Sequence, residues 1–106
     1  MTNNEYQTVA KSTDIPLGKT LCVNVNGKEI LLCHSNEGFY AVDNLCSHAE
    51  AKLSEGKLKG CRILCPLHGA AFDIRDGQAL SKPASKSIKS YPLQVLEDQI
   101  QIQLGE

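Results

Sequence analysis

Two short stretches, Cys46-Ser47-His48 and Cys65-Pro66-Leu67-His68, each offer one thiolate and one imidazole as candidate metal ligands. A zinc site of the finger type usually takes a pair of cysteines followed by a pair of histidines. Here the order is Cys, His, Cys, His, so each stretch can give one ligand to each of two metal ions. The interleaving favours a binuclear iron–sulfur centre, with two cysteines on one iron and two histidines on the other, over the zinc alternative.

Around these stretches, apolar residues alternate with polar ones as they do in half-buried β-strands. The clearest prediction is a hairpin of residues 21–25 and 28–33 around Asn26-Gly27, the dipeptide favoured in a type I′ turn. A two-residue loop sets the register, and the predicted core face then carries Leu21, Val23, Ile30 and Leu32. The opposite face, predicted to be more polar, carries Thr20, Cys22, Asn24, Glu29, Leu31 and Cys33.

The rest of the chain also predicts strands, and no segment has the apolar stripe of a helix. The other predicted strands are residues 5–10, 39–43, 61–64, 71–74, 87–96 and 99–104. Residues 52–60 and 78–86 are predicted to be irregular, because they are polar or rich in Gly, Pro and small residues. We therefore expect an all-β fold, an antiparallel β-sandwich or barrel, with a smaller cluster-binding part of about residues 44–80 inserted between its strands.

Composition excludes several classes of protein. The 106 residues suit one domain spanning residues 1–106, with 42% hydrophobic and 22% charged residues. Lys plus Arg is 11 and Asp plus Glu is 12, so no strong charge points to nucleic acid or a membrane as partner. No apolar run approaches the roughly 20 residues that span a bilayer, and the N-terminus lacks the features of a signal peptide. We expect a cytoplasmic monomer.

The remaining cysteines and the third histidine are not expected to bind a metal. Cys22, Cys33 and Cys61 are predicted to be free thiols, because an odd number of spare cysteines in a reducing compartment does not suggest a disulfide framework. Cys61 has no matching histidine and is rejected as a ligand. His34, at the end of the predicted hairpin, is expected to be structural or solvated.

The two stretches, with residues 43–56 and 65–73 around them, resemble the cluster-binding loops of Rieske proteins, and most closely the small Rieske-type ferredoxins of bacterial ring-hydroxylating dioxygenase systems. The resemblance covers essentially the whole chain and implies the Rieske fold with one [2Fe–2S] cluster. It implies that Cys46 and Cys65 hold the inner iron, and that His48 and His68 hold the outer iron through Nδ1. It also makes Pro83 a candidate for a loop that covers the cluster, with an ordinary loop proline as the alternative.

The function implied by this resemblance is one-electron transfer from a flavin-dependent ferredoxin reductase to a terminal oxygenase that hydroxylates aromatic rings. No Gly-rich dinucleotide motif and no catalytic residue is evident. A Rieske oxygenase would also need a mononuclear iron held by two histidines and a carboxylate, and only His34 remains for it. Two alternatives stay open: the small Rieske-like subunit of an assimilatory nitrite reductase, and a zinc-stabilised structural domain.

The resemblance also bears on the reduction potential. High-potential Rieske proteins have a disulfide between their two ligand loops, whereas this chain has Ala51 and Leu67 at the matching positions. Those proteins also have a serine and a tyrosine that donate hydrogen bonds to sulfur, whereas this chain has Ala70 and Phe72 there. We therefore expect a potential toward the low end of the Rieske range.

Overall fold

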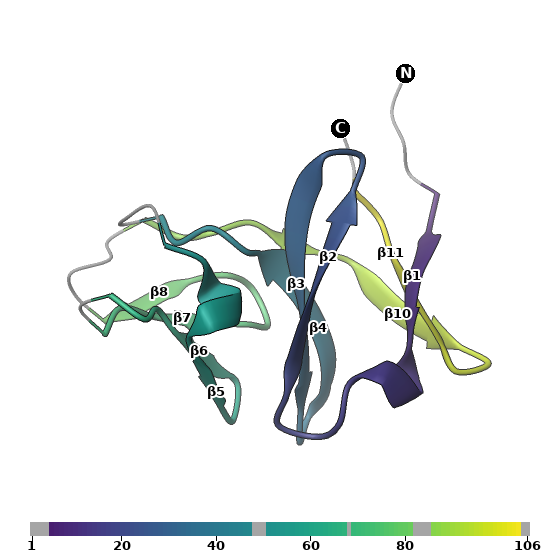
Figure 1. Ribbon diagram of the computed structural model, residues 1–106, viewed down its shortest axis with the longest axis horizontal. Helices are drawn as coiled ribbons and strands as arrows, with labels where there is room; N and C mark the ends of the chain where they lie inside the picture. The colour runs from purple at the N-terminus through teal and green to yellow at the C-terminus, as the bar shows by residue number, and fades with distance from the viewer. Residues whose placement is uncertain (1–4, 48–50, 68, 82–85, 105–106) are drawn as a thin grey trace.

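The computed structural model describes residues 5–47, 51–67, 69–81 and 86–104, and it arranges them in three antiparallel sheets (Figure 1). The first sheet has the order β1 (Gln7–Lys11), β11 (Gln99–Ile102) and β10 (Leu93–Leu96). The second has the order β2 (Thr20–Val25), β3 (Lys28–Ser35), β4 (Gly38–Asp43) and β9 (Ser90–Tyr91). The third has the order β5 (Lys57–Lys59), β6 (Arg62–Leu64), β7 (Ala71–Asp73) and β8 (Ala79–Ser81). The only helical segments in these ranges are the short 3-10 turns η1 (Ser12–Asp14) and η2 (Leu53–Glu55), so the all-β prediction is confirmed.

The second sheet has a core on each of its faces. Figure 1 shows the first sheet on one side of it and the third sheet on the other. One core joins the first two sheets through Ile30, Leu32, Ala41, Tyr91, Ile100 and Ile102. The other core joins the second and third sheets through Leu31, Cys33, Val42, Ile63, Phe72 and Ile74. A strand that is buried on both faces is nearly continuous in apolar residues, and residues 30–33 of β3 have that pattern.

The predicted hairpin register is correct, but the prediction that only one of its faces belongs to a core is wrong. Val23 pairs with Ile30 and Cys22 with Leu31, and Asn26 and Gly27 have φ of 52° and 83°, as a type I′ turn requires. On the face predicted to be polar, however, Leu31 and Cys33 have no exposed surface. The third sheet covers that face, and this long-range contact cannot be inferred from the alternation within the hairpin.

Two strands were not predicted, and one predicted strand is divided in the structure. β5 and β8 lie in the segments predicted to be irregular, and each is only three residues long with largely exposed side chains. Such short segments carry too little alternation to be detected. The predicted strand of residues 87–96 is divided into β9 and β10 at Pro92, which has no N–H to donate to a neighbouring strand.

The arrangement of β2 and β3 predicts how the spare thiols react. Cys22 pairs with Leu31 and Cys33 with Thr20, so the two cysteines are diagonal neighbours and both are free thiols. Burial raises the pKa of Cys33 to about 12, whereas Cys22 is only half-buried. We expect alkylation of the native protein without reductant to label Cys22 and to spare Cys33, because the thiolate is the reactive form. Mass spectrometry after denaturation should then find both labelled, and a peptide linked through Cys22 and Cys33 would contradict this.

Candidate metal centre

The two candidate ligand stretches lie in loops that are closed in the same way. In ligand loop 1 (residues 46–51), the backbone N–H of Cys46 donates a hydrogen bond to the carbonyl of Ala51 at 3.0 Å. In ligand loop 2 (residues 65–70), the N–H of Cys65 donates to the carbonyl of Ala70 at 2.7 Å. Loop 1 follows β4, and loop 2 joins the paired strands β6 and β7. Each cysteine therefore occupies the first position of a loop whose two ends are fixed.

The structure brings the two cysteines together, although they lie far apart in the sequence. Cys46 is 6% exposed and Cys65 is 3% exposed, and both belong to the core between the second and third sheets. Cys46 lies close enough to Cys65 to affect its ionisation. Burial raises the pKa of Cys65, and the neighbouring Cys46 raises it further, whereas the backbone N–H of Leu67, which hydrogen-bonds to the Cys65 sulfur, lowers it.

This environment fits a pair of thiolate ligands. The raised pKa of Cys65 disfavours its thiolate in the free protein, and a bound cation would reverse that balance because it stabilises the thiolate form. The Leu67 N–H also favours the thiolate of Cys65. Cys46 and Cys65 therefore lie in the same apolar core, and the assignment of both cysteines to one iron stays a prediction.

The two candidate histidine ligands, His48 and His68, lie outside the described residues. Pro83, the candidate for a covering loop, lies outside them as well. His34 is described, and its ring stacks on Phe39 with a centroid separation of 3.9 Å. Its Nδ1 lies 2.7 Å from the carbonyl oxygen of Ile15. These contacts are those of a structural histidine, as the sequence predicted.

Two serines that were not candidate residues connect the ligand loops to the chain on either side of residues 82–85. The Ser47 hydroxyl, between Cys46 and His48 in the sequence, donates to the carbonyl of Lys86 at 2.5 Å. The Ser81 hydroxyl donates to the carbonyl of Gly69 in loop 2 at 3.5 Å, and it accepts a hydrogen bond from the N–H of Ala71 at 3.1 Å. The position of Ser47 directly after a ligand is the one signal in the sequence that could have indicated such a role.

The immediate surroundings of the cysteines are apolar. Ala70 and Phe72 have no exposed surface and lie in the same core as the two cysteines. Two leucines that neighbour the ligands in the sequence, Leu45 and Leu67, are instead 58% and 46% exposed.

Within the described ranges, no helix has the length and hydrophobicity needed to cross a membrane.

Comparison with known proteins gives consistent matches. The ferredoxin component of the naphthalene 1,2-dioxygenase/salicylate 5-hydroxylase systems of Ralstonia sp is 49% identical over 82 residues, which cover 77% of this chain and 79% of that protein. The ferredoxin component of the naphthalene 1,2-dioxygenase system of Pseudomonas putida is 42% identical over 105 residues, which cover 99% of this chain and 100% of that protein. A solved complex of reduced oxygenase and oxidized ferredoxin in carbazole 1,9a-dioxygenase contains a chain that is 30% identical to this protein, with a TM-score of 0.88. The match covers 95% of this chain and 94% of the chain in the complex.

The matching family model is described as a Rieske [2Fe-2S] domain and spans residues 5–92. Its cofactor is a [2Fe–2S] cluster, which decides between the iron–sulfur and zinc interpretations of the paired cysteines and histidines. A match of this length, together with relatives this similar over most of their own length, shows that the chain belongs to the Rieske [2Fe-2S] domain family.

Proposed function

We infer that the protein is the Rieske ferredoxin of an aromatic-ring-hydroxylating dioxygenase system, an electron carrier and not an enzyme. The observation that carries this conclusion is the pair of buried cysteines, Cys46 and Cys65, brought side by side by two loops in a chain of this family. The similar ferredoxin components of Ralstonia and Pseudomonas support the same role, because they match along most of their length.

The ligand set is part of the proposal. Cys46 and Cys65 hold the inner iron, and His48 and His68 hold the outer iron. The bound [2Fe–2S] cluster supplies a centre that gains and loses one electron. The protein contributes an apolar environment that excludes water from the cysteine side, and the N–H of Leu67, which stabilises negative charge on the Cys65 sulfur.

The proposed partners are a flavin-dependent ferredoxin reductase as electron donor and a terminal oxygenase as electron acceptor. Each docks in turn on the end of the molecule formed by the ligand loops, where Leu45 and Leu67 expose apolar surface beside the ligands. A carrier that alternates between partners needs small, short-lived interfaces, so we propose a single-domain monomer. A cytoplasmic location belongs to the same proposal, because the three cysteines outside the ligand set, Cys22, Cys33 and Cys61, are free thiols, and a reducing compartment keeps thiols in that state.

Removal of any one ligand should abolish the cluster or make it labile. We expect the Ala variants of Cys46, His48, Cys65 and His68 to lose Rieske-type visible and EPR spectra, together with the iron and acid-labile sulfide. The far-UV circular dichroism should largely persist, because the core between the first two sheets contains none of these residues. His34→Ala is the matched control and should keep its spectra. Intact Rieske spectra in Cys46→Ala or His68→Ala would disprove the ligand assignment.

The reduction potential should be low for a Rieske protein, on the order of −150 mV. Ala70 and Phe72 lie in the core with both cysteines and have no hydroxyl that could donate to sulfur, so the additional electron is less stabilised. Ala70→Ser and Phe72→Tyr should each raise the potential measured by film voltammetry, provided that the new hydroxyl reaches a sulfur. Phe39→Tyr, in the other core, should leave it unchanged. A potential of roughly +100 mV or more in the unaltered protein would mean that other dipoles dominate.

The exposed side chain of Leu67 should matter for docking and not for the cluster. We expect Leu67→Gln to raise the KM for the ferredoxin in oxygenase turnover by about tenfold, since central apolar contacts contribute most of the energy of an interface. Its potential and visible spectrum should stay unchanged. The matched control is Leu96→Gln, on the first sheet, where Leu96 is 53% exposed. Equal KM values for the two variants would place the docking surface elsewhere.

A further inference from the structure

Asn44 is a fully buried polar residue two positions before the first ligand, and it is not one of the residues assigned to the cluster. Its exposure is 0%, and among the described residues only Ser35 is a second buried polar residue. A buried carboxamide is costly unless its polar atoms are hydrogen-bonded, so its partners indicate what it holds in place.

Asn44 uses its backbone and its side chain to connect three segments of the chain. Its backbone N–H donates to the carbonyl of Glu29 in β3 at 3.1 Å, and its carbonyl accepts from the N–H of Leu53 at 2.7 Å. Its Nδ2 donates to Oε1 of Glu29 at 3.1 Å, and its Oδ1 accepts from the N–H of Ser54 at 2.8 Å. Asn44 therefore ties the segments before and after ligand loop 1 to each other and to β3.

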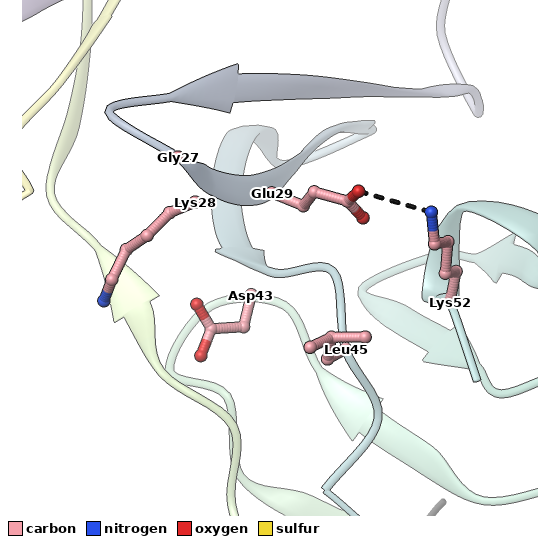
Figure 2. A pocket seen from close by; sticks show the side chains of 6 residues that line it. All are labelled: Gly27, Lys28, Glu29, Asp43, Leu45 and Lys52. Carbon is pink, nitrogen blue, oxygen red and sulfur yellow. Dashed lines mark hydrogen bonds and ion pairs between the residues drawn. The ribbon is translucent and has the colours of Figure 1, made fainter. Parts of the chain in front are cut away.

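The Glu29 carboxylate completes this arrangement. Its second oxygen, Oε2, lies 3.2 Å from Nζ of Lys52, which directly follows loop 1 (Figure 2). The hydrogen bond from Asn44, followed by the contact with Lys52, lowers the pKa of Glu29, so the carboxylate stays ionised at neutral pH. Lys52 is about half-exposed, and an exposed ion pair contributes little to stability. The buried Asn44 is therefore the stronger of the two partners of the Glu29 carboxylate. Figure 2 shows Glu29 and Lys52 in contact at the edge of a surface pocket. The pocket is lined by Gly27, Lys28, Glu29, Asp43, Leu45 and Lys52.

We propose that Asn44 and Glu29 are positioning residues for electron transfer, which hold both ends of ligand loop 1 on β3 and so keep Cys46 in one place beside Cys65. The inference rests on the proposed function, because the loop must hold the cluster in the same geometry in both oxidation states. The hydrogen bond between Cys46 and Ala51 closes the loop at its base, but it does not attach the loop to the sheet. Asn44 makes that attachment, and its hydrogen bonds set the orientation of the chain as it enters the loop.

The test is a charge substitution with a designed rescue. Asn44→Asp keeps the acceptor for the Ser54 N–H but turns a carboxylate toward Glu29, so the two groups repel each other. We expect the cluster to be lost to a chelator about tenfold faster than in the unaltered protein, and the EPR lines of the reduced protein to broaden as loop 1 samples several positions. Adding Glu29→Gln restores a donor opposite the new carboxylate and should recover most of both properties.

Two further variants keep the outcome interpretable. Asn36→Asp is the matched control, because the exposed Asn36 lies in the turn between β3 and β4, at the opposite end of β3 from Glu29. It should leave both readouts unchanged. Glu29→Ala covers the case in which Asn44→Asp does not fold. It removes the carboxylate that accepts the hydrogen bond from Asn44 Nδ2, and it should also accelerate cluster loss, by a smaller factor than Asn44→Asp.

The outcomes separate this inference from the proposed function. Asn44→Asp with the chelation rate and EPR line width of the unaltered protein would overturn the inference, and so would a double variant that is no better than Asn44→Asp alone. A fall in thermal stability without EPR broadening would assign Asn44 a purely structural role, which also overturns it. Failure of the proposed function would show itself differently, as the absence of a Rieske signal from the unaltered protein.

Discussion

The candidate metal centre depends on one constraint: two cysteine sulfurs from distant parts of the chain must lie side by side inside an apolar core. Cys46 and Cys65 meet this constraint because each begins a loop that is closed at its base, and both loops belong to the core that joins the second and third sheets. The described residues of the two loops form no helix or strand that could place a cysteine by itself. The accuracy of the site must therefore come from the way the loops are attached to the sheets.

One attachment is a close approach between the chain after loop 1 and the strand before loop 2. A Cβ on Gly56 would lie 1.7 Å from the carbonyl oxygen of Leu64, so no other residue fits there without a shift of the backbone. Leu64 directly precedes Cys65, and Gly56 follows the 3-10 turn that ends the segment bound by Asn44. The segments beside the two loops thus pack backbone against backbone, and Ala51 and Leu67 offer no thiols for a disulfide between the loops.

The parts of this structure that could be predicted from the sequence are those with a local signal. The hairpin register follows from Asn26-Gly27 and from the alternation on either side of it, and the pairing of Cys46 with Cys65 follows from the repeated Cys/His order. The burial of Leu31 and Cys33 could not be predicted, because it depends on a third sheet that is formed later in the chain. The partners of Asn44 escaped prediction for the same reason: a single asparagine before a ligand does not reveal which glutamate or which backbone N–H it will meet.

The same apolar environment that positions the sulfurs also influences the charge they can carry. Reduction adds negative charge to a cluster, and a buried site disfavours that charge unless hydrogen-bond donors or cations compensate it. Among the described residues, the donor shown to reach a cysteine sulfur is the backbone N–H of Leu67, while Ala70 and Phe72 offer none. A backbone donor is fixed by the conformation of its loop, so its contribution depends on the loop geometry and not on a side chain that could be exchanged. In this protein, therefore, the attachments that hold loop 2 also hold the Leu67 N–H that lowers the pKa of Cys65, so a change in the conformation of this loop would also change the electrostatics at that sulfur.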